Sequence, residues 1–98
     1  MSKSEVLRKD LESKSILKVG GAFDAMSAKL VENAGFDAVW AGSFAISATH
    51  ALPDASILTM TEFFDAASSM SSTCKIPIIA DCDTGYGGPS NVRHMVQK

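Results

Sequence analysis

The sequence lacks the features of secreted, membrane-spanning and nucleic-acid-binding proteins. Two cysteines among 98 residues indicate neither a disulfide framework nor a zinc site, and we expect two reduced thiols. The net charge is −2 and the basic residues are scattered, so no patch for nucleic acid or an anionic membrane is present. Residues 1–15 contain no secretory signal, and the longest uncharged segment, 38–53, is too polar to span a bilayer. We therefore expect a cytoplasmic globular protein.

Short apolar runs alternate with helical patterns along the chain. The predicted strands are residues 16–19, 36–42 and 75–81. The predicted helices are residues 4–13, 24–35 and 59–73, and a further helix begins at Pro89. The segment 43–58 is predicted to be a structured loop with one helical turn. Repeated βα units with continuous apolar strands predict an α/β fold with a parallel sheet.

Two architectures fit this order, a doubly wound sheet and a (β/α)8 TIM barrel. The helix that precedes the first strand favours the barrel. A barrel takes about 250 residues. Residues 1–98 would then be a single partial domain, the N-terminal third of a barrel with about three βα units. We expect such a chain to be unstable or aggregation-prone in isolation, and inactive.

Polar and small residues follow each predicted strand, at the edge where α/β enzymes bind their ligands. Gly20-Gly21 follows the first strand, residues 40–43 follow the second, and residues 81–83 follow the third. Asp54 lies in the long second loop, where a turn or helix-cap role is the simpler interpretation. Trp40 at a strand end is more often a core residue than a site residue.

Asp81 and Asp83 are the strongest candidates for a metal site. If the extended backbone persists to residue 83, both carboxylates point to the same side and repel each other unless a cation lies between them. Carboxylate oxygens suit Mg²⁺ or Mn²⁺. The alternative is a polar turn in which Asp81 caps a nearby group. A calcium loop is excluded by Tyr86 and Val92, and a dinucleotide fingerprint by Ser90.

Three segments together carry a family resemblance: "GAFDAMSAKLVENAGFDAVWAGS" (21–43), "LPDASILTMTEF" (52–63) and "IPIIADCDTGYGG" (76–88). From about residue 15 onward the chain resembles the isocitrate lyase/phosphoenolpyruvate mutase superfamily, and most closely its phosphoenolpyruvate mutase and phosphonopyruvate hydrolase branch. The resemblance implies a (β/α)8 barrel with Mg²⁺ and a small 2-oxo acid at the C-terminal ends of the strands. It also implies a homo-oligomer, a tetramer.

The resemblance implies specific roles for three aspartates. Asp81 matches the aspartate that approaches the metal most directly, and Asp83 matches one that holds it through water. Asp54 matches the catalytic loop aspartate near the metal and the reacting group. A further acidic metal contact, a mobile lid and a substrate-binding Arg and Asn would lie beyond residue 98.

Substrate-binding roles are implied for the residues after the second strand. Trp40 matches the aromatic residue beside the pyruvyl unit. Gly42 and Ser43 match the pair whose backbone N–H groups bind the substrate carboxylate. The family commonly has Ser-Gly at these two positions, so a contact through the serine hydroxyl would move in this chain.

The function implied is that of a Mg²⁺-dependent phosphoenolpyruvate mutase-like isomerase of phosphonate metabolism, present as an N-terminal fragment. Phosphonopyruvate hydrolase is an alternative, as is a C–C lyase that acts on a methylisocitrate-like acid. The lyase branches carry a catalytic cysteine in a later loop, which neither Cys74 nor Cys82 matches. A truncated chain that is not catalytic and only assembles with a partner is the alternative of a different class.

Overall fold

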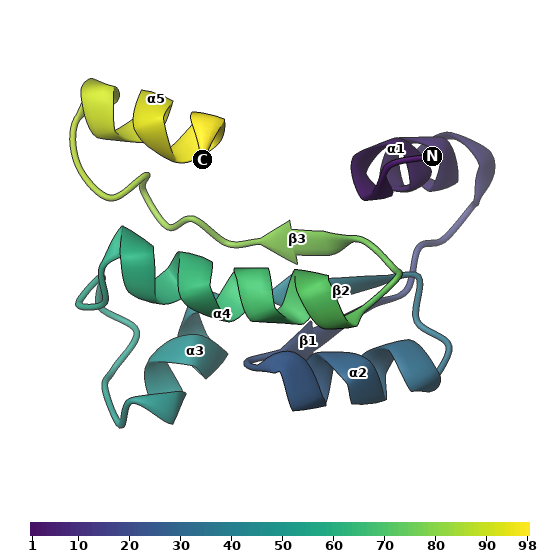
Figure 1. Ribbon diagram of the computed structural model, residues 1–98, viewed down its shortest axis with the longest axis horizontal. Helices are drawn as coiled ribbons and strands as arrows, with labels where there is room; N and C mark the ends of the chain where they lie inside the picture. The colour runs from purple at the N-terminus through teal and green to yellow at the C-terminus, as the bar shows by residue number, and fades with distance from the viewer.

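The computed structural model describes all residues, 1–98, and has five helices and three strands (Figure 1). In chain order they are α1 (Lys3–Ser13), β1 (Val19–Ala22), α2 (Ala25–Asn33), β2 (Ala38–Ala41), α3 (Ser43–Thr49), α4 (Met60–Thr73), β3 (Ile78–Ala80) and α5 (Pro89–Gln97). None of the helices is both long and apolar enough to cross a bilayer.

The three strands form one parallel sheet in the order β1-β2-β3. Ala22, Ala41 and Ala80 are aligned across the sheet, so all three strands end at the same edge. The residues that follow the strands are therefore brought together at the C-terminal edge. This arrangement confirms the predicted α/β class with a parallel sheet.

Helices α2 and α4 pack together on one face of the sheet, and α3 lies beside them, whereas α1 and α5 lie apart from this layer (Figure 1). Val39 and Ala41 of β2 point into the layer and are buried with Ile46 of α3 and Met70 of α4. Burying a side chain such as Met70 stabilises the fold by about 1.5–3 kcal/mol. The main core cluster thus lies on the helical face.

The opposite face of the sheet is uncovered over most of its area, although Ala38 is buried on it. Side chains alternate along each strand, so Val19, Gly21, Trp40 and Ile79 share this face. Trp40 is 41% exposed there, which is unusual for the only tryptophan of the chain. Within these residues Trp40 is therefore not part of the buried core, and its role at the site stays a prediction.

Gly20 and Gly21, predicted to follow the first strand, lie inside the observed strand. This strand, β1, runs from Val19 to Ala22, whereas residues 16–19 were predicted. A Cβ on Gly20 would come within 2.6 Å of a methyl group of Val31 and 3.2 Å of the Phe36 ring. Glycine here allows α2 to pack closely against the sheet. The sequence pattern alone presented this pair as a strand end.

Two helices begin as their sequences predict. The side chains of Asp24 and Thr59 accept hydrogen bonds from the backbone N–H groups of Ser27 and Glu62, forming the capping boxes of α2 and α4. The second loop is more helical than predicted, because α3 has seven residues where one turn was expected.

Candidate functional site

A hollow of about 270 Å³ opens at the C-terminal edge of the sheet. It collects residues from the ends of β1 and β2, the start of α3, the second loop and the end of β3. Its lining is Gly21, Ala22, Trp40, Gly42, Ser43, Phe44, Ala45, Asp54 and Asp81. Five of the six predicted site residues therefore line one hollow, and Asp83 does not.

The carboxylate of Asp81 is held by three donors. The Ser43 hydroxyl donates to Oδ2 at 3.0 Å, the Ser43 N–H approaches the same oxygen at 3.4 Å, and the Asp83 N–H donates to Oδ1 at 3.0 Å. These donors lower the pKa of Asp81 below its usual value, the Asp83 N–H most of all and Ser43 after it. Asp81 is therefore an ionised, oriented carboxylate at neutral pH.

Asp83 occupies a different position from the predicted one. The strand ends at Ala80, and Asp83 has φ +48°, so the backbone is no longer extended at this residue. The premise that placed both carboxylates on one side of a strand is therefore wrong. Asp83 is exposed and lines a neighbouring hollow of about 400 Å³ with residues 56–59 of the second loop.

Tyr86 anchors the loop that carries both aspartates. Its ring lies 5.6 Å from that of Phe63 and 6.5 Å from that of Phe64 on α4, and its hydroxyl donates to the Asp81 carbonyl at 3.4 Å. Burial raises the pKa of Tyr86, so the phenol stays protonated. The predicted site omitted Tyr86, although an aromatic residue within a glycine-rich turn is a signal for such an anchor.

Trp40 and Gly42 are coupled by their packing. A Cβ at residue 42 would lie 2.7 Å from Trp40 Nε1 and 3.0 Å from its Cδ1. Real Cβ atoms do not approach neighbours this closely, so glycine leaves room for the indole beside the hollow. Phe44, 73% exposed at the start of α3, is a further lining residue that the loop prediction for 43–58 missed.

Asp54 is an exposed carboxylate on the rim of the hollow. Its side chain makes no hydrogen bond or ion pair with the protein, so it caps no helix. An acid without a protein partner at the mouth of a hollow is free to contact a ligand. The helix-cap interpretation of Asp54 is therefore wrong, whereas the residue does lie in a bend of the second loop.

The donor set fits a hard divalent cation, although it does not complete a site. No three His, Cys, Asp or Glu side chains are placed together to hold a metal ion. Mg²⁺ typically takes one or two protein carboxylates and fills its remaining positions with water and substrate oxygens. Asp81 suits the direct ligand, whereas Asp83 lines the neighbouring hollow, and its contact through water stays a prediction.

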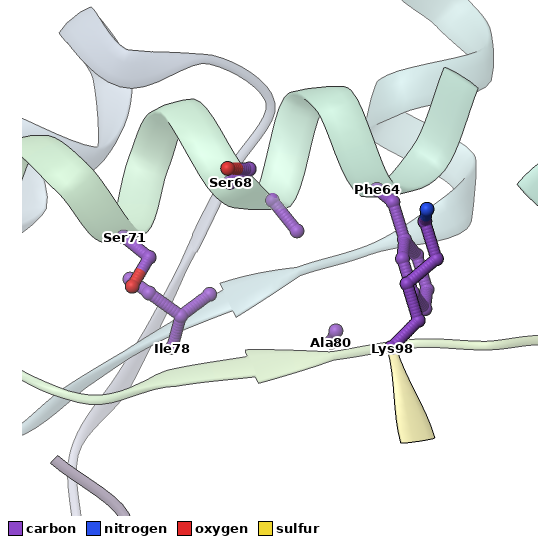
Figure 2. A pocket seen from close by; sticks show the side chains of 7 residues that line it. Phe64, Ser68, Ser71, Ile78, Ala80 and Lys98 are labelled. Carbon is purple, nitrogen blue, oxygen red and sulfur yellow. The ribbon is translucent and has the colours of Figure 1, made fainter. Parts of the chain in front are cut away.

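A second hollow, of about 350 Å³, lies between α4 and β3 (Figure 2). Phe64, Ile78 and Ala80 form its apolar lining, and Lys98 reaches it from the end of the chain. It lies on the helical face of the sheet and contains neither a carboxylate nor any predicted site residue. The candidate site is the hollow at the C-terminal edge, because it brings together five of the six predicted site residues.

The remaining candidates are structural or distant. His50 ends α3, where its Nδ1 lies 3.2 Å from the Ile46 carbonyl, and His94 is exposed on α5. Cys74 and Cys82 are both free thiols, as predicted. Burial raises the pKa of each cysteine, so neither is a reactive thiolate.

Comparison with known proteins agrees with this geometry. The family model of phosphoenolpyruvate phosphomutase matches residues 7–98. The chain belongs to the phosphoenolpyruvate phosphomutase family. The family resemblance of the sequence is thereby confirmed.

Two solved structures and one curated relative align with almost the whole of this chain. The crystal structure of phosphoenolpyruvate phosphomutase from Streptomyces platensis subsp. rosaceus superposes with a TM-score of 0.95 and 45% identity, over 98% of this chain and 33% of that one. A phosphonopyruvate hydrolase in complex with oxalate and Mg²⁺ gives 0.94 and 41%, over 98% and 34%. The 2,3-dimethylmalate lyase of Eubacterium barkeri is 38% identical, over 100% and 34%.

The chain spans about a third of the length of the relatives it matches. Its three parallel βα units have the architecture of the N-terminal portion of a (β/α)8 barrel. The uncovered face with Trp40 corresponds to the inner face of such a barrel, and the hollow to its C-terminal mouth.

Proposed function

We propose that these residues form the N-terminal third of a Mg²⁺-dependent phosphoenolpyruvate mutase-like enzyme that interconverts phosphoenolpyruvate and phosphonopyruvate. The observation that carries this proposal is the single hollow that unites Trp40, Gly42, Ser43, Asp54 and Asp81. Support comes from the phosphomutase structure at 45% identity and from the related hydrolase that binds oxalate and Mg²⁺. The activity is proposed for the longer protein.

The reaction moves a phosphoryl group between oxygen and carbon of one pyruvate skeleton. In the direction of phosphonopyruvate, the P–O bond of phosphoenolpyruvate breaks and a P–C bond forms, with no gain or loss of atoms. The charge that must be stabilised is that of the pyruvate enolate. Mg²⁺ held near Asp81 would supply this stabilisation as a Lewis acid.

The residues of this chain would hold the planar pyruvyl unit and the phosphoryl group. Trp40 offers a flat apolar wall, and the backbone N–H of Gly42 is a candidate for the substrate carboxylate, whereas that of Ser43 already points to Asp81. Asp81 contributes negative charge for the cation. Asp54, which has no protein partner, would face the transferred group from the rim.

Phosphonopyruvate hydrolase is the second candidate, because a hydrolase structure matches almost as well as the phosphomutase. There, water attacks phosphorus, the P–C bond breaks, and the enolate takes a proton to become pyruvate. A C–C lyase is less favoured, because the solved structure of a 2,3-dimethylmalate lyase superposes with a TM-score of 0.87 and 33% identity, below the phosphomutase and hydrolase structures.

The test is incubation of the full-length protein with phosphonopyruvate and Mg²⁺, followed by phosphorus NMR. A phosphoenolpyruvate signal supports the mutase, whereas free phosphate with pyruvate identifies the hydrolase. Untouched phosphonopyruvate with folded, metal-loaded protein would overturn both and favour the lyase. A native mass near that of the 98 residues alone would instead favour a non-catalytic chain.

A further inference from the structure

The order Gly42-Ser43 has a structural explanation in the contacts of both residues. Ser43 is only 4% exposed, and its hydroxyl lies 3.0 Å from Asp81 Oδ2. It is the only side chain that donates a hydrogen bond to Asp81. A serine at position 42 would not replace it, because a Cβ there would lie 2.7 Å from Trp40 Nε1.

The donors around Asp81 leave one position free. A carboxylate has about four lone-pair sites, two on each oxygen. Oδ2 accepts from the hydroxyl and the N–H of Ser43, and Oδ1 accepts from the Asp83 N–H alone. The remaining site is therefore on Oδ1. Without the hydroxyl, Oδ2 would keep only the long 3.4 Å contact, and the carboxylate could rotate.

Building on the Mg²⁺-dependent function proposed above, we propose that Ser43 is a positioning residue for Asp81. Its hydroxyl fixes the carboxylate so that Oδ1 is presented to the cation. The side chain thus acts on metal binding through Asp81 and does not contact the substrate. Partners that orient a metal-binding side chain typically change metal affinity 10–100-fold when they are removed.

The first experiment measures metal affinity without substrate. Full-length wild-type, Ser43→Ala, Ser43→Gly and Ser43→Thr proteins are titrated with Mn²⁺ alone, and free Mn²⁺ is followed by electron paramagnetic resonance. We expect Ser43→Ala and Ser43→Gly to raise the Kd about tenfold. Ser43→Thr keeps the hydroxyl and should restore most of the affinity. Wild-type affinity in either the Ala or the Gly variant would overturn the proposal, even if the Thr variant does not fold.

The second experiment separates positioning from substrate binding. Oxalate is titrated into wild-type and Ser43→Ala proteins that are saturated with Mn²⁺. We expect equal oxalate affinities, because the lost hydroxyl acts on the metal ligand. A large loss of oxalate affinity with an unchanged Kd for Mn²⁺ would make Ser43 a substrate-binding side chain and overturn the proposal.

A double variant tests the order of the two residues. Gly42→Ser combined with Ser43→Gly restores the common family order but places a Cβ against Trp40. We expect it to bind Mn²⁺ no better than Ser43→Gly alone, whereas full recovery would contradict the proposal.

The metal titrations contain no phosphonopyruvate. If the full-length protein does not convert phosphonopyruvate but Ser43→Ala weakens Mn²⁺ binding, the proposed reaction is refuted and the positioning role stands. If the protein is active but Ser43→Ala binds Mn²⁺ as tightly as wild type, the positioning role is refuted and the reaction stands.

Discussion

The two edges of the sheet use carboxylates in opposite ways. At the N-terminal edge, Glu32 accepts from the N–H groups of Lys75 and Ile76 at 2.5 and 3.1 Å, and Asp37 accepts from the Lys18 N–H at 2.9 Å. Each of these acids also pairs with a lysine. At the C-terminal edge, Asp81 has no cationic partner, and Asp54 has no partner at all.

The difference lies in the partners that each edge offers to a carboxylate. Segments that lead into strands present N–H groups that need acceptors. A carboxylate placed there accepts these hydrogen bonds and has a structural role. Where strands end, Asp81 also accepts three donors, but none of them is a cation, and the Asp54 side chain accepts none. Identical side chains are therefore structural at one edge and available for a cation or substrate at the other. Four substitutions test this contrast.

Asp81→Ala should have the largest effect, because it removes the one carboxylate that is both oriented and available to a cation. In the full-length protein we expect Mg²⁺ affinity to fall by about 100-fold or more, because loss of a residue that only orients a metal ligand already costs about 10–100-fold. Isothermal titration with Mg²⁺ measures this. Asp81→Asn is the matched control, because it keeps an amide oxygen for the Asp83 N–H yet loses the charge and should fail similarly. Wild-type affinity in Asp81→Ala would remove Asp81 from the metal site.

Asp54→Ala should separate catalysis from metal binding. We expect turnover of phosphonopyruvate to fall about 100-fold or more, as for loss of a group that acts on the reacting atoms. Mg²⁺ affinity should change little, because other residues hold the ion. Asp65→Ala, which removes an exposed acid of α4 outside the hollow, is the control and should retain turnover. Parallel losses of turnover and metal affinity would make Asp54 a metal ligand or a folding residue.

The sequence predicted the parallel α/β class and the starts of α2 and α4, and five of the six residues expected at the site line one hollow. It did so because apolar periodicity and capping are local signals. It misplaced β1, since the close contacts of Gly20 with Val31 and Phe36 are made only in the folded chain. It also misplaced Asp83. That residue has a positive φ in a turn, and Tyr86 anchors this turn by packing against Phe63 of α4.

Glu32→Gln tests the structural edge. Glu32 bridges α2 to the segment before β3, so we expect a fall of several degrees in the melting temperature of the full-length protein, with unchanged turnover of the folded fraction. The Lys29 ammonium, and after it the Lys75 N–H, lower the pKa of Glu32 to about 2. Thermal melts combined with the phosphorus assay measure both quantities. A variant with normal stability and impaired turnover would reverse the assignment of the two edges.

The pH dependence of stability has a definite sign at Glu32. Its pKa in the folded protein lies below the usual value of 4.5, so the unfolded chain binds the proton more readily. Its contribution is fully present above about pH 4.5 and is lost as the pH falls toward 2. Melts of wild type and Glu32→Gln should therefore converge over this interval. A difference that persists at pH 2 would show that the glutamate acts through packing and not through its charge.

Asp37→Asn should have the smallest effect. Asp37 accepts one backbone N–H, where Glu32 accepts two, and its partner Lys14 is 44% exposed at a distance of 2.6 Å. Exposed ion pairs contribute little because water and salt screen them. We expect a smaller fall in melting temperature than for Glu32→Gln, and raising the salt concentration should abolish part of it, because the Lys14 contact contributes most to the lowered pKa of Asp37. An effect equal to that of Glu32→Gln would mean that ion pairs, and not the number of backbone donors, set the strength of the N-terminal edge.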